Sequence, residues 1–160
     1  GFFMDIKITE EVENTLKDDG LKEEEIREII ESAEANGSKL KSRSEDTYIA
    51  KGESENLTVY AVFTPSSNGN VDLINVYTHK MNVNGPTGGE IGEVEYDDES
   101  DWICERCNEV ALQRNVDMNY LGVSRPGPAL ICPECNETYV TQGVATTLKT
   151  AESILEEKRA

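Results

Sequence analysis

The chain has 160 residues, of which 32 are acidic and 15 are basic, for a formal net charge of −17. Non-specific nucleic-acid binding depends on lysine and arginine neutralising phosphates, so this charge argues against a nucleic-acid partner. An anionic membrane surface would repel the chain as well, and no apolar run approaches the roughly 20 residues of a membrane-spanning helix. No secretory signal sequence is visible, so we expect a cytoplasmic protein. The excess acid suits solubility, or docking on a basic face of another protein.

Residues 1–82 are predicted to form an acidic α+β domain. Residues 5–8 alternate as in a short strand, and Thr9 is a good N-cap for the short helix that follows. An apolar stripe over residues 21–36 predicts a second helix, with Gly37 at the position of a left-handed C-cap. Three strands then form an antiparallel meander, over Tyr48 to Ala50, Leu57 to Phe63 and Val71 to Thr78. The last two are joined by a turn centred on Asn68 and Gly69.

A change of composition marks the boundary with the second half of the chain. Residues 83–100 contain several glycines followed by a run rich in Glu and Asp, which is typical of a flexible, self-repelling linker. Residues 101–160 are predicted to form a second domain, a four-cysteine ribbon. It ends in a helix in which Val144, Leu148, Ala151 and Leu155 recur at helical spacing. The expected fold class is therefore α+β, with an acidic N-terminal domain and a C-terminal zinc-ribbon or rubredoxin-like domain.

Four cysteines in two Cys-x-x-Cys pairs are the strongest functional signal in the sequence. The pairs, Cys104/Cys107 and Cys132/Cys135, have nearly the same local sequence, and each is followed by Asn. Asn is the residue after Gly that best tolerates the positive φ that ends a metal-binding knuckle. Four thiolates at this spacing suit one tetrahedral zinc or a single iron. A redox-active disulfide is the weaker alternative, since a thioredoxin-like site needs one pair at a strand-to-helix turn.

The identity of the metal stays open between zinc and iron. The second pair, Cys-Pro-Glu-Cys, resembles a knuckle of rubredoxins, which hold iron. However, those proteins have glycine after each pair and a denser aromatic core than Trp102, Tyr120 and Tyr139 could supply. We therefore favour zinc, with iron as the alternative.

No set of residues predicts an active site. With four sulfur ligands the metal has no open position for substrate, and no phosphate-binding loop or isolated carboxylate pair is present. His79 is the only histidine, and we expect it to be a solvated residue at the end of a strand. The protein is therefore predicted not to be an enzyme.

Part of the C-terminal half resembles a family of small proteins of anaerobes. The resemblance rests on the Cys104/Cys107 pair, the strand over residues 116–122, the second knuckle running from Ile131 to Val140, and a Leu/Glu/Lys-rich terminal helix. Members are described as redox or zinc-ribbon proteins and are associated with genes for molybdenum-dependent hydroxylases of the xanthine dehydrogenase and aldehyde oxidoreductase type. This sequence departs from the pattern at Asn108 and Asn136, where glycine is common.

The resemblance implies an accessory or electron-transfer role beside a molybdenum enzyme. From the residues and the resemblance together, the sequence predicts a non-catalytic metal-binding adaptor. Its four-cysteine ribbon would hold a structural zinc, and its partner would be a protein, with a molybdenum-dependent oxidoreductase as the candidate. The alternative is a rubredoxin-like one-electron carrier with iron in the same site.

Overall fold

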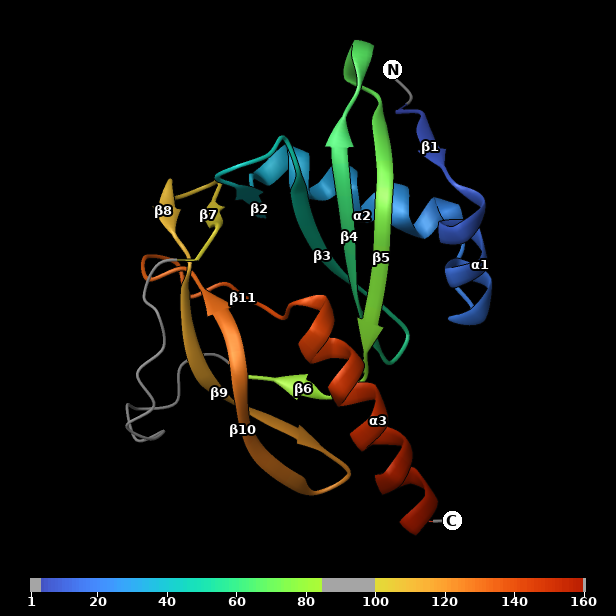
Figure 1. Cartoon of the computed structure of the whole chain (residues 1–160), viewed down its shortest axis with the longest axis vertical. Helices are drawn as coiled ribbons and strands as arrows, with labels where there is room; N and C mark the ends of the chain where they lie inside the picture. The colour runs from blue at the N-terminus through green and yellow to red at the C-terminus, as the bar shows by residue number, and fades with distance from the viewer. Residues whose placement is uncertain (1–3, 85–99, 160) are drawn as a thin grey trace.

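The structure is a computed structural model that describes residues 4–84 and 100–159 (Figure 1). The helices are α1 (Glu10–Asp18), α2 (Glu23–Asn36) and α3 (Gln142–Arg159), with a 3-10 turn, η1, at Ser67–Gly69. The strands are β1 (Ile6–Ile8), β2 (Lys39–Ser42), β3 (Tyr48–Ser54), β4 (Leu57–Pro65), β5 (Val71–His79), β6 (Asn82–Val83), β7 (Trp102–Cys104), β8 (Glu109–Val110), β9 (Leu112–Tyr120), β10 (Val123–Ile131) and β11 (Thr138–Tyr139). The predicted linker, residues 83–100, lies for the most part outside the described residues.

A seven-stranded sheet in the order β1-β5-β4-β3-β2-β7-β8 forms the middle of the molecule. The fold class is α+β, as predicted, and the meander is antiparallel, but it contains four strands instead of three. The additional strand, β2, has the sequence Lys-Leu-Lys-Ser, which carries no apolar alternation. Tertiary contacts make a strand of it, because Leu40 is buried in the core and Lys39 is buried with an ion pair to Glu34 at 2.6 Å.

Helices α1 and α2 cover one face of this sheet (Figure 1). Along β4, Val59, Ala61 and Phe63 face the helices, while Tyr60 between them faces the opposite side. Such alternation follows from the period of two of a strand. Helix α2 approaches β3 closely at Gly52, where a Cβ atom would lie 2.5 Å from the Ile29 side chain.

Both helices begin or end where the local sequence predicts. The Thr9 hydroxyl accepts a hydrogen bond from the Val12 N–H at 3.2 Å and caps α1. Gly37 ends α2 with φ 75°, in the left-handed region that glycine adopts without steric cost.

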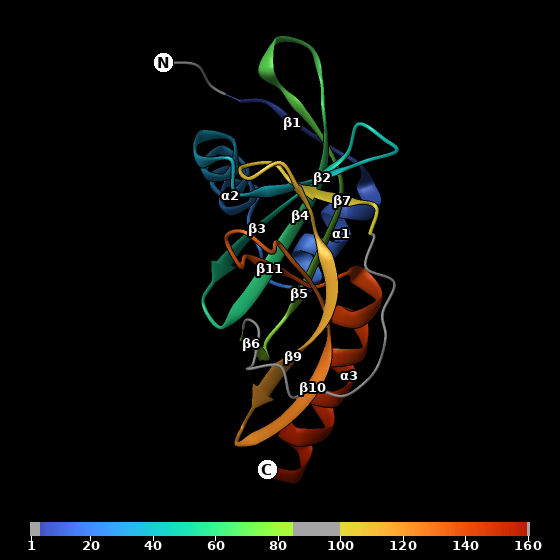
Figure 2. The same ribbon diagram turned by 90° about the vertical axis from the view of Figure 1, so that its left-hand side faces the viewer.

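The other face of the seven-stranded sheet is covered by a four-stranded sheet, β11-β10-β9-β6, and by α3 (Figure 2). Their shared core includes Tyr60 and Tyr77 from the first sheet and Val116 and Tyr139 from the second. The Tyr77 hydroxyl donates to the Val140 carbonyl at 2.7 Å, so a polar contact also joins the two layers. The molecule therefore has three layers, with helices, a large sheet, and a small sheet with its helix.

Strands cross between the two predicted ranges in both directions. β6, at the boundary of the 1–82 range, pairs with β9 in the four-stranded sheet. β7 and β8, from the 101–160 range, extend the seven-stranded sheet by pairing with β2. Residues of both ranges thus contribute to the same sheets and the same core. None of the helices in the described ranges is both long and apolar enough to span a bilayer.

Candidate metal centre

Each pair of cysteines is held in a tight turn that closes on an asparagine. The Asn108 N–H donates to the Cys104 carbonyl at 2.7 Å, and the Asn136 N–H donates to the Cys132 carbonyl at 2.8 Å. Both asparagines have positive φ, 56° and 64° respectively. The prediction that each asparagine adopts the positive φ usually taken by glycine in such a turn is confirmed at both positions.

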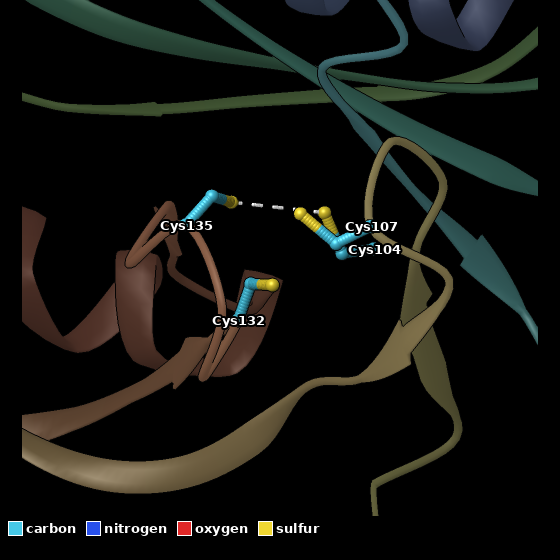
Figure 3. Close-up of side chains that lie close together, drawn as sticks. All are labelled: Cys104, Cys107, Cys132 and Cys135. Carbon is cyan, nitrogen blue, oxygen red and sulfur yellow. Dashed lines mark hydrogen bonds between the residues drawn. The ribbon is translucent and has the colours of Figure 1, made fainter.

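The two turns bring the four sulfur atoms to one point (Figure 3). All four Sγ atoms lie within 4.8 Å of one another, and those of Cys104 and Cys135 are 3.9 Å apart. Four sulfurs about 2.3 Å from a tetrahedral metal would be about 3.8 Å apart, so the arrangement fits such an ion. The structure brings together all four cysteines that the sequence singled out.

The first turn belongs to the seven-stranded sheet and the second to the four-stranded sheet. Cys104 ends β7, which pairs with β2, and Cys107 lies in the turn between β7 and β8. Cys132 and Cys135 lie between β10 and β11. A metal bound to all four sulfurs would therefore join the two sheets, as well as close the C-terminal part on itself.

Residues between the end of α2 and the start of β2 support the first turn from outside. The Glu105 N–H donates to the Lys39 carbonyl at 3.0 Å. Gly37 lies close to Arg106, because a Cβ atom added at Gly37 would be 3.4 Å from the Arg106 Cα. The Ser38 hydroxyl donates to the Glu137 carboxylate, which also lies 3.7 Å from the Arg106 guanidinium. Glu137 follows the second turn, so this network links both turns to the N-terminal half of the chain.

The thiols have unequal electrostatic surroundings. Burial raises the pKa of the Cys104 thiol to about 12, and burial also raises the pKa of Cys107. Burial acts in the same direction on Cys135, but hydrogen bonds from the Arg106 guanidinium and the Glu137 backbone outweigh it and lower the pKa of Cys135 to about 7. The Cys135 thiol therefore ionises more readily than those of Cys104 and Cys107, and a metal would be needed to hold these two as thiolates.

Access to the centre is one-sided. Cys104 and Cys132 are buried at 1% and 0% exposure, whereas Cys107 and Cys135 are half-buried. A metal here would be shielded by the protein on the side of Cys104 and Cys132 and would come closer to solvent at the other two sulfurs.

The prediction for His79 is wrong. The side chain is 1% exposed, and its Nε2 lies 2.9 Å from the hydroxyl oxygen of Tyr60. Although His79 ends β5, the chain continues into β6 and α3 packs against this region, so the strand end is covered. Burial lowers the pKa of His79 to about 4, which keeps the imidazole neutral near pH 7. It takes no part in the cysteine cluster.

Two basic residues near the centre were not predicted from the sequence. Arg106 contacts Cys135 from within the first turn. Its place between Cys104 and Cys107 in the sequence could have indicated a position beside the cysteine cluster. Lys51, in β3, places its ammonium on the Thr138 carbonyl and 5.0 Å above the Tyr139 ring, just beyond the second turn. No local pattern indicates Lys51, because its partners lie more than 80 positions away in the sequence.

Comparison with known proteins gives one partial match. Residues 100–158 match a family described as a domain of unknown function (DUF7479). The matched range begins just before β7 and ends within α3, so it contains all four cysteines. It does not contain β2 and β6, the strands of the N-terminal half that pair with β7 and β9. No curated protein and no solved structure matches the chain.

Proposed function

We propose that this protein is a non-catalytic metal-binding adaptor whose four cysteines hold a structural zinc. The observation that carries the proposal is the convergence of four sulfur atoms from two sheets within 4.8 Å. Zinc in structural sites is four-coordinate, with thiolate as a preferred ligand, and contributes directly to folding. With every position taken by sulfur, the ion has none left for substrate, which supports a structural role.

In this role, the zinc fixes the small sheet and α3 against the large sheet. The helical layer on the far side carries acidic first turns, Glu10, Glu11 and Glu13 in α1 and residues 23–25 in α2. A fixed acidic surface suits a partner protein with a basic face. The resemblance described above supplies a molybdenum-dependent oxidoreductase as the candidate partner.

Elemental analysis with a visible spectrum tests the metal. The full chain would be expressed anaerobically with both zinc and iron supplied. We expect one equivalent of zinc per chain and no visible absorption. A chain that purifies without metal, or a pair of disulfides on mass analysis, would contradict the proposal.

The second candidate function is a one-electron carrier with iron in the same site. Two features favour it: Cys107 and Cys135 are half-buried, which brings the metal near the surface, and Arg106 donates a hydrogen bond toward the Cys135 sulfur. Exposure and hydrogen bonds to sulfur are the means by which proteins tune iron–thiolate potentials. One iron per chain, with charge-transfer bands that bleach reversibly on reduction, would support this function in place of the first.

Partner capture tests the adaptor role separately from the metal. Zinc-loaded protein would be compared with Cys104→Ser as bait for a purified molybdenum-dependent oxidoreductase, at low and high salt. We expect the zinc-loaded protein to capture the oxidoreductase and the Cys104→Ser variant not to do so. High salt should weaken this capture, because salt screens the acidic surface. Equal capture by both baits would show that the fixed arrangement of the sheets is not what the partner recognises.

A further inference from the structure

A polar cleft of about 470 Å³ opens between the two sheets, and no cysteine lines it. One wall comes from β3, β4 and the end of β5, and the other comes from β6, β9 and β11, whose positions can be followed in Figure 1. The volume lies within the range of small-molecule sites, and junctions between structural units are where such sites often occur.

The cleft contains one lysine that forms no ion pair with a carboxylate of the described residues, although Glu137 and Glu53 lie near enough to favour its charged form. Lys51 donates to the Thr138 carbonyl and lies over the Tyr139 ring. Within residues 4–84 and 100–159, Lys51 has no acidic side chain at ion-pair distance. An ammonium has three donors, so it can serve the carbonyl and an anionic ligand together. A partly buried cation is favoured by an anion beside it, because burial removes part of its hydration.

Neutral hydrogen-bonding groups complete the lining. The Asn82 amide lies 3.4 Å from the Asn119 side-chain oxygen on the wall formed by the small sheet. On the other wall, the Tyr60 hydroxyl and the His79 ring form a buried pair at 2.9 Å. Amides and hydroxyls of this kind orient a ligand by accepting and donating hydrogen bonds.

The charges in and around the cleft limit the ligand to at most one negative charge. Among the described residues that line the cleft, Lys51 is the only cationic side chain, and Glu53 lies in the same lining. A dianionic phosphate would carry one charge more than Lys51 compensates, on a protein whose net charge is −17. A carboxylate carries one charge and can accept two hydrogen bonds from an ammonium and an amide.

We propose that this cleft binds a small monocarboxylate that also carries a hydroxyl or amide group. Its carboxylate would lie on the Lys51 ammonium, and its second polar group would contact the amides of Asn82 and Asn119. This inference goes beyond the adaptor function and does not depend on which metal the cysteines hold.

The test is an NMR titration of the full, metal-loaded chain, with metal content verified beforehand. L-lactate is the probe, propionate is the same shape without the hydroxyl, and inorganic phosphate is the dianionic comparison. We expect lactate to shift the signals of Lys51 and of the Asn82 and Asn119 side-chain amides saturably, with a Kd on the order of 1 mM. Propionate should bind several-fold more weakly.

Two variants and one control make the test specific to the cleft. Lys51→Met should weaken lactate binding about tenfold, because a charge-assisted hydrogen bond is lost. Asn119→Asp keeps the size of the side chain and adds a like charge, so it should weaken binding to a similar extent. Lys7→Met, at the exposed position of β1, should leave binding unchanged.

Three results would overturn the inference. They are shifts that rise without saturation, lactate affinity unchanged in both cleft variants, and phosphate binding in the cleft where lactate does not. A folded protein with zinc absent would instead contradict the adaptor proposal, so the two failures are distinguishable.

Discussion

Leu40 and Cys104 face each other across neighbouring antiparallel strands, and each is 1% exposed. Leu40 lies in β2, in the N-terminal half, whereas Cys104 is one of the four clustered cysteines. The first cysteine pair is thus built into one end of the large sheet. Loss of the metal should therefore be felt in strands that carry no ligand.

Cys132→Ser tests this coupling, because it removes a ligand from the small sheet alone. We expect metal loss and faster amide hydrogen exchange in β2 and β7 as well as in β10 and β11, since the metal joins both sheets. Hydrogen exchange read by mass spectrometry would show the affected strands. Ser124→Ala, on the exposed end of β10, is the control and should change neither the metal content nor the rate of amide exchange. Exchange that accelerates in residues 105–159 but not in β2 would contradict the coupling.

Arg106→Gln should make the metal easier to displace by acid. The guanidinium lowers the pKa of the Cys135 thiol, so its removal raises that pKa and lets protons compete with the metal at higher pH. Residues that hydrogen-bond to ligands are commonly worth about tenfold or more in metal affinity. A colorimetric chelator would follow metal release during an acid titration. The matched control is Arg125→Gln, an exposed arginine away from the cysteines; a release midpoint shared by both variants would argue against the role of Arg106.

Asn136→Ala should lower the free energy of unfolding by about 1 kcal/mol, because alanine pays the cost of a left-handed conformation without compensation. Asn136 has φ 64°. Asn136→Gly should be close to neutral or slightly stabilising, since glycine adopts this conformation freely. Thermal unfolding of the zinc-loaded proteins compares the two. Equal stability of the alanine and glycine variants would mean that the strain at this turn is relieved elsewhere.

Glu152→Ala should lower the free energy of unfolding by about 2–4 kcal/mol. The carboxylate, 3% exposed, accepts hydrogen bonds from the N–H groups of Lys80 and Met81 at 2.8 Å each. Its loss would leave one buried and one partly buried donor unpaired. Glu152→Gln keeps one acceptor oxygen and should cost less. Chemical denaturation measures the difference, with exposed Glu157→Ala as the reference. A cost for Glu152→Ala no larger than that of the reference would show that these hydrogen bonds do not hold α3 in place.

The imidazole of His79 should remain neutral down to a pH near 4. Its folded pKa of about 4 lies below the ordinary value of 6.5, so the unfolded chain binds more protons between these limits. Stability from this residue is fully present above pH 6.5 and is lost as pH falls toward 4, by about 3 kcal/mol in total. As the sequence has one histidine, its ring proton NMR signal can be titrated directly. A midpoint near 6.5 would show that the ring is hydrated.

Local chemistry in the sequence was sufficient to predict the ends of helices and the cysteine turns. Thr9 caps α1 from an extended conformation, and Gly37 and the asparagine after each cysteine pair adopt positive φ, as these residue types favour. Each of these features depends on residues within a few positions of one another. The four cysteines were singled out for the same reason, because the spacing within each pair is a local property.

Features that depend on distant contacts could not be predicted in this way. Strand β2 is mostly polar and exists because β3 and β7 pair with its two edges. Burial of His79 and placement of Lys51 depend on the small sheet and α3, which come from the other half of the chain. Nothing in the alternation of residues near these positions indicates a covering layer.

The pairing of β2 with β7 has a consequence for synthesis on the ribosome. The chain passes through β3, β4, β5 and β6 before β7 emerges, so during this time one edge of β2 has no partner. Unpaired strand edges are templates for association with other chains. The four-sulfur site is complete only after the second cysteine pair, which follows β10, has also emerged. β7 must therefore cover the edge of β2 before a metal can add its support, so a chain interrupted between β6 and β7 would be the form most prone to association with other chains.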